Sequence, residues 1–180
     1  MQRTRDTQKK KLYAAERTPE MLRWWDAKPM GTIVEVWVFL DRVRKDAWFR
    51  RHYGMWNFRV DNGQGARIAR GGYNGRSLFK EHISYLKLPR WSRTPLIVLH
   101  EIAHGITLQK HGSHTAFHGR EYAAIYLDLV RHFLGTEAGD RLRTAYRQKG
   151  VKHRPKRVLS PEQLVVMQER GRQLAAARRS

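Results

Sequence analysis

Two histidines and a glutamate stand at a spacing that suits a metal-dependent hydrolase. His100 and His104 are separated by three residues, and Glu101 directly follows the first, giving the pattern H-E-x-x-H. Residues four apart on a helix share one face, so both imidazoles can reach the same ion. Glu101 is rotated by about 100 degrees from His100 and can reach a water on the metal without being a ligand. We therefore predict a Zn²⁺ site at His100 and His104, with Glu101 as the general base.

A catalytic zinc needs a third protein ligand, and several downstream residues are candidates. We favour His118, because it opens the next predicted helix and a loop of about a dozen residues can return it to the metal. Glu121 is the second choice. His111 follows His104 one residue too late for the H-E-x-x-H-x-x-G-x-x-H pattern, so His111 and His114 are expected in a loop that lines the cleft or faces solvent. The same ligand types also accept manganese, cobalt or nickel.

Helices must position these residues. Thr94-Pro95 reads as an N-cap followed by proline at the first helical position, which predicts a helix from there to about Gln109. A second helix is expected over residues 120–134, closed by Gly135, and a third over 139–149. The histidine pair therefore lies on one predicted helix and His118 just before the next.

The preceding half of the chain predicts a mixture of helices and short strands. Residues 7–25 have helical spacing with a break near Pro19, and the charged end of 31–48 favours a helix there. Between residues 58 and 88, short apolar runs alternate with glycine- and asparagine-containing groups that predict the turns of a strand meander.

We therefore expect an α+β fold of the zincin-like type, with helices around a short, mostly antiparallel sheet. A single small domain would occupy residues 1–150. A basic linker over 151–160 and a basic C-terminal helix over 161–180 would follow it.

The amino-acid composition excludes some classes of function and favours others. The chain has 180 residues, with 36 Lys and Arg against 16 Asp and Glu, a net charge of +20 that attracts polyanions. Cysteine is absent, which excludes disulfides, a catalytic thiol and Cys-ligated zinc. No signal peptide or membrane-length apolar stretch is present, so we expect no membrane partner and a cytoplasmic location.

Basic clusters raise a second hypothesis, non-specific nucleic-acid binding. Aromatic side chains interleave with one cluster at residues 48–53, a composition able to stack bases and hold phosphates. The alternative is a solvated basic surface with the aromatic residues in the core. The candidate contacts are Arg50, Arg51, Lys152, Arg154, Lys156 and Arg157.

The segment 93–134 resembles the zincin core of SprT-like proteins. It is still more similar to small actinobacterial and actinophage proteins described as metallohydrolases, which share R-T-x-x-x-V-L-H-E-I-A-H, here Arg93–His104, and H-G-x-x-[FY], here His118–Tyr122. A fainter similarity covers residues 11–16 and 41–49. The resemblance implies that His100, His104 and His118 bind zinc, that Glu101 is the general base, and that a short sheet lies beside the metal helix. Unlike many SprT-like proteins, the chain has no Cys-based zinc ribbon.

The sequence thus predicts a zinc metallopeptidase that acts on a protein or peptide in the cytoplasm of a bacterium, or of a bacterial host if the chain is phage-encoded. The alternative is a nucleic-acid-binding or phage structural or interaction protein with a non-catalytic His/Glu cluster.

Overall fold

The structure is a computed structural model that describes residues 5–154, 169–170 and 172–173. Its α+β class matches the prediction. In chain order the elements are α1 (Lys9–Glu16), α2 (Leu22–Trp25), α3 (Ile33–Lys45), α4 (Ala47–Tyr53), β1 (Trp56–Asp61), β2 (Arg70–Arg76), β3 (His82–Lys87), a 3₁₀ turn (Arg90–Ser92), α5 (Pro95–His111), α6 (Arg120–Phe133) and α7 (Thr136–Lys149). The predicted linker beyond residue 154 and most of the predicted helix over 161–180 lie outside the described residues.

Local sequence signals account for the helix boundaries. The Thr94 side chain accepts a hydrogen bond from the Ile97 amide, and Pro95 is the first residue of α5, as predicted. Helix α3 begins with a capping box, in which the Thr32 and Glu35 side chains each accept from the other residue's backbone amide. The predicted helix within residues 31–48 is present as α3, and the expected break between α1 and α2 is also present.

The sheet is mixed, and the predicted meander is wrong. Its strand order is β1-β3-β2, with β1 parallel and β2 antiparallel to β3. The glycines at 71, 72 and 75 that were predicted to form turns lie inside β2 instead.

The reason is the close approach of β2 to α5. A Cβ at Gly71 would overlap the carbonyl oxygen of Glu101 in α5. A Cβ at Gly105 would lie 3.1 Å from the carbonyl oxygen of Gly72 in β2 and 2.7 Å from Ser84 Oγ in the neighbouring β3. The missing side chains let the edge strand lie against the helix that carries the histidine pair.

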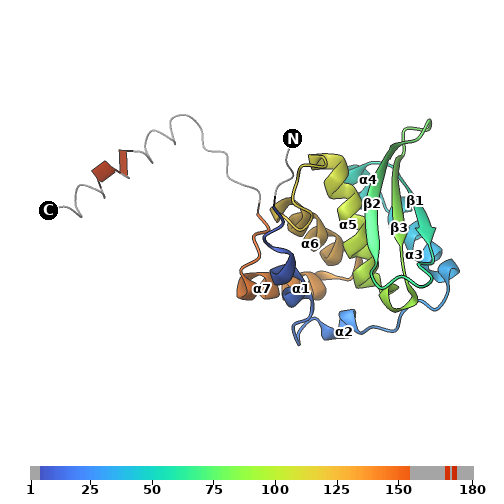
Figure 1. The fold of residues 1–180 in the computed structure, drawn as a ribbon, viewed down its shortest axis with the longest axis horizontal. Coiled ribbons are helices and arrows are strands. Elements are labelled where there is room, and N and C mark those ends of the chain that lie inside the picture. The colour runs from blue at the N-terminus through green and yellow to red at the C-terminus, as the bar shows by residue number, and fades with distance from the viewer. Residues whose placement is uncertain (1–4, 155–168, 171, 174–180) are drawn as a thin grey trace.

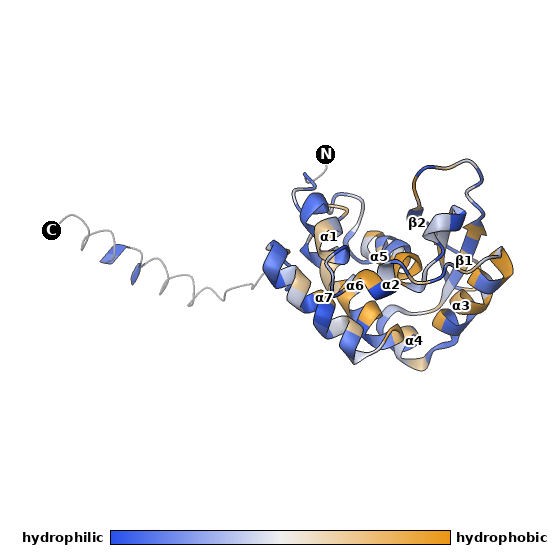
Figure 2. Ribbon diagram, turned by 90° about the horizontal axis from the view of Figure 1, so that it is seen from below, coloured by the Kyte–Doolittle hydropathy of each residue, from blue (hydrophilic) through white to orange (hydrophobic). Residues whose placement is uncertain are grey.

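The helices gather on one side of the sheet (Figure 1). Helix α5 packs along β2 and β3, α3 packs against β1, and α6 packs on α5, with α7 next to α6 and α1. Hydrophobic residues concentrate on α3, α5 and α6, whereas α7 is largely hydrophilic (Figure 2). Among the described residues, no helix combines the length and apolar character needed to cross a membrane.

Candidate metal centre

Three histidines from helix α5 and from the connection between α5 and α6 converge in the interior. His100 and His104 come from α5, and His118 from the residues just before α6. One ligand nitrogen of each lies within 4.8 Å of those of the others, and all three side chains are buried. The spacing brings the α5 pair together, while the packing of α6 on α5 adds the third ring.

Carboxylates hold two of these rings in place. His100 Nδ1 lies 2.6 Å from Glu16 Oε1, and His118 Nδ1 lies 2.7 Å from Asp6 Oδ2. With Nδ1 engaged, each ring keeps Nε2 for another partner. Both carboxylates belong to the N-terminal segment, about a hundred residues away along the chain from the histidines they contact.

The donor set fits a bound cation. His118 Nε2 is buried and has no hydrogen-bond partner among the described residues. Glu16 is fully buried, and its Oε2 also lacks a hydrogen bond within the described part of the chain. Buried anions and orphaned imidazole nitrogens are both costly, and a divalent ion among the rings would relieve both.

The surroundings act on the two histidines in opposite directions. Burial lowers the pKa of His100, but the charge and hydrogen bond of Glu16, with the charge of Glu101, outweigh burial and raise it. Burial and the charge of His100 lower the pKa of His118 despite the contact with Asp6. A lowered pKa keeps the His118 imidazole neutral, which is the form that ligates metals.

Glu101 is buried beside the cluster without belonging to it. It is 6% exposed, and together with His100 it lines a cavity of about 340 Å³. Burial raises the pKa of Glu101, opposed by the charge of His100 and by a hydrogen bond from the Gly71 backbone. A carboxyl with a raised pKa that faces a cavity is suited to accept and return a proton.

Aromatic rings enclose the histidines. Tyr13 stacks on His100 with ring centroids 5.6 Å apart, and Tyr122 contacts the rings of all three histidines. The Tyr122 hydroxyl donates to the carbonyl of His100, and burial raises the pKa of Tyr13 to about 12. Both phenols are therefore neutral at ordinary pH, and the centre has a largely apolar wall.

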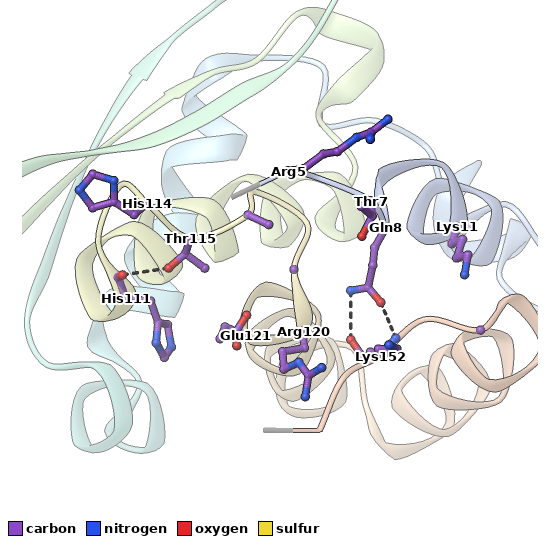
Figure 3. A pocket seen from close by; sticks show the side chains of 13 residues that line it. Arg5, Thr7, Gln8, Lys11, His111, His114, Thr115, Arg120, Glu121 and Lys152 are labelled. Carbon is purple, nitrogen blue, oxygen red and sulfur yellow. Dashed lines mark hydrogen bonds between the residues drawn. The ribbon is translucent and has the colours of Figure 1, made fainter. Parts of the chain in front are cut away.

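The alternative third ligands lie elsewhere. His111, His114 and Glu121 do not join the histidine group, and they line a separate cavity of about 610 Å³ between the α5–α6 connection and the N-terminal segment (Figure 3). His111 and His114 are both exposed. His114 lies in the predicted loop, whereas His111 is the last residue of α5, so the loop prediction was wrong for His111. Of the candidates, only His118 is brought to the α5 pair.

Four of the six predicted nucleic-acid contacts lie within the described residues. Lys152 lines the 610 Å³ cavity, and Arg154 is exposed two residues later. Arg50 and Arg51 are exposed on α4 and do not line that cavity. Lys156 and Arg157 lie outside the described residues. Of the interleaved aromatic side chains, Phe49 and Tyr53 are buried and cannot stack on bases.

Sequence reasoning missed Asp6, Glu16 and Tyr13 as parts of the site. One signal for Glu16 was available, because it lies four residues after the buried Leu12 and so shares the apolar face of its helix. The faint similarity over residues 11–16 also covers Tyr13 and Glu16.

Comparisons with known proteins do not name a relative: no family model, curated protein or solved structure matches this chain.

Proposed function

We propose that the chain is a zinc-dependent hydrolase that cuts peptide bonds. The observation that supports this proposal most strongly is the buried group of His100, His104 and His118 with Glu101 beside it at a cavity. Three imidazoles with room for water or substrate are the usual ligand set of a catalytic zinc, as distinct from the closed set of a structural one.

Each residue of the proposed centre has a separate role in the reaction. His100, His104 and His118 would hold the ion, and Glu16 and Asp6 would orient two of the rings. When bound, zinc supplies Lewis acidity that polarises a carbonyl and makes a water molecule acidic near neutral pH. Glu101 then accepts the proton of the attacking water and returns it to the leaving amine. The surrounding aromatic rings limit the access of bulk water.

Replacement of the base tests this assignment. Glu101→Gln should lower the hydrolysis of a denatured protein substrate by about 10²-fold to 10⁴-fold, the usual contribution of a general base. The zinc content of the variant should equal that of the parent, because Glu101 is not a ligand. Full turnover in the zinc-loaded variant would show that another group activates the water.

A second candidate function, polyanion binding, is favoured by the 610 Å³ cavity. Four cationic side chains line it against one carboxylate, that of Glu121, and within the described ranges no ion pair occupies any of the four. Unpaired cations around a polar cavity suit phosphate groups of a nucleic acid. The four cations are Arg5, Lys11, Arg120 and Lys152.

The salt dependence of DNA binding distinguishes a defined binding site from attraction by the net charge of the protein. Lys11→Gln/Lys152→Gln should weaken binding of a labelled DNA duplex and reduce the slope of log K against log salt by about 2. Arg50→Gln/Arg51→Gln removes the same charge from α4 and should change the slope by less. Equal effects of the two double substitutions on the slope would show that DNA binding depends on net charge alone.

A further inference from the structure

The cavity beside Glu101 is lined by apolar and cationic side chains that have no role in holding a metal ion. Its apolar wall includes Trp25, Trp91 and Ile97, and the segment that leads into β2 adds Ile68. Ile68 is 54% exposed and Trp91 is 51% exposed. Large apolar side chains that remain exposed around one cavity indicate a surface that a ligand covers.

Cations stand around the same cavity. They are Lys9, Arg17 and Arg67, all exposed. The Arg17 guanidinium lies 4.9 Å from the centre of the Trp25 ring, and Lys9 Nζ lies 6.0 Å from that of Tyr13. These contacts hold two of the positive charges against the aromatic wall.

The cavity lacks compensating negative charge. Among the described residues, Glu101 is the only acidic one that lines it, and this carboxyl is buried beside His100. Across the described part of the chain, none of the three cations forms an ion pair with a carboxylate. The outer part of the cavity therefore presents uncompensated positive charge next to aromatic surface.

We propose that this cavity selects peptides carrying a bulky apolar side chain next to a carboxylate. The apolar side chain would pack against Trp25, Trp91 and Ile97, and the carboxylate would pair with Arg17 and Arg67. The carboxylate comes either from an Asp or Glu side chain or from the peptide C-terminus. This inference names the substrate class of the proposed hydrolase and so rests on that function.

Peptide binding tests the inference without turnover. The zinc-loaded full chain carrying Glu101→Gln is titrated against fluorescein-labelled peptides, amidated at the C-terminus, that contain Phe-Glu, Phe-Lys, Phe-Gln or Ala-Glu. Phe-Glu should bind about tenfold or more tightly than Phe-Lys, since a charge-assisted contact is gained and a repulsion avoided. It should also bind more tightly than Ala-Glu. A Phe-Gln peptide with a free C-terminus distinguishes the terminal carboxylate from the side-chain one.

Charge reversal supplies the matched control. Arg17→Glu/Arg67→Glu should reverse the preference between Phe-Glu and Phe-Lys, whereas Arg50→Glu/Arg51→Glu, with the same change in net charge on α4, should preserve it. Trp91→Ala, which changes no charge, should weaken Phe-Glu but not Ala-Glu. All of the changed side chains are exposed, and circular dichroism verifies folding.

Several results would overturn the inference. The first is equal affinity for Phe-Glu and Phe-Lys, and the second is an equal effect of the two charge reversals on peptide binding. The third is that a short oligothymidylate displaces bound Phe-Glu and binds both charge-reversal variants as tightly as it binds the parent. Failure of the proposed hydrolase itself appears separately, as an absence of bound zinc or of peptide cleavage by the parent chain.

Discussion

Two carboxylates from the N-terminal segment fix the orientation of the histidines in the proposed centre. Glu16 contacts His100 and Asp6 contacts His118, each at Nδ1. Such a contact selects the tautomer with Nε2 free and makes that nitrogen a stronger ligand. The N-terminal segment thus contributes to the site, although it supplies none of the three histidines.

Glu16 should therefore affect zinc binding, although it is not one of the three proposed ligands. We expect Glu16→Gln to weaken zinc affinity by about 10-fold to 100-fold, because the His100 ring loses an anionic partner. Glu20→Gln, which removes the same charge at an exposed position nearby, should leave zinc affinity unchanged. Competition with a chromogenic chelator measures both values, and equal affinities in the two variants would contradict a positioning role for Glu16.

Residue spacing revealed the part of the site that is local in sequence. His100, His104 and Glu101 were identifiable because one helix turn places them together. The apolar face of α1 gave a signal for Glu16. The contacts of Glu16 and Asp6 with the histidines were nevertheless not identifiable, because they depend on where the N-terminal segment docks, and no short-range pattern encodes that docking. Their position next to the histidines is a product of tertiary packing.

At the scale of elements, helices were more predictable than strand order. The α5 boundary is encoded in Thr94 and Pro95, which act locally on the helix end. The position of β2 depends instead on the space that Gly71 and Gly105 leave between the strand and α5. In the sequence, Gly71 is equally typical of a turn, so the pattern alone favoured the wrong arrangement.

Helix capping gives a pH-dependent prediction for α4. The Asp46 carboxylate accepts a hydrogen bond of 2.8 Å from the Phe49 amide and lies 3.0 Å from His132 Nε2. Burial raises the pKa of Asp46, but these two partners outweigh burial and lower it below the ordinary 3.8. The ionised carboxylate thus stabilises the fold above about pH 4, and this contribution is lost as the pH falls through the folded-state pKa.

Asp46→Asn keeps a good N-cap and removes the charge. We expect it to lower the free energy of unfolding at pH 6 by about 0.5 to 1 kcal/mol and to show a smaller difference from the parent at pH 3. Urea unfolding at the two pH values measures this, with Asp26→Asn as the exposed control. A difference that stays constant or grows at pH 3 would contradict the role of the charge.

At the scale of the whole molecule, the N-terminal segment and the residues after α7 meet beside the histidine group. The Gln8 side chain donates to the carbonyls of His118 and Lys152 and accepts from the Lys152 amide. Helix α1 also packs on α7. These contacts keep the N-terminal segment, with Asp6 and Glu16, against the histidines. Gln8 and Lys152 also line the 610 Å³ cavity (Figure 3).

Charge is divided between the centre and its surroundings. Residues 91–138, which carry the histidines, have four basic and four acidic side chains, so the net charge of +20 comes entirely from the flanks. Composition could predict that excess but not its distribution. The packing places cations around two separate cavities, one beside Glu101 and one beside the α5–α6 connection.

The central claim, that His100, His104 and His118 hold a metal ion, is tested most directly by the zinc content of the purified protein, measured by elemental mass spectrometry. The parent chain should carry about one zinc ion per chain. His118→Ala should lose most of it, while His114→Ala, at the exposed loop histidine, should retain it. A folded parent without metal after incubation with zinc, or a His118→Ala variant with undiminished zinc, would contradict the account.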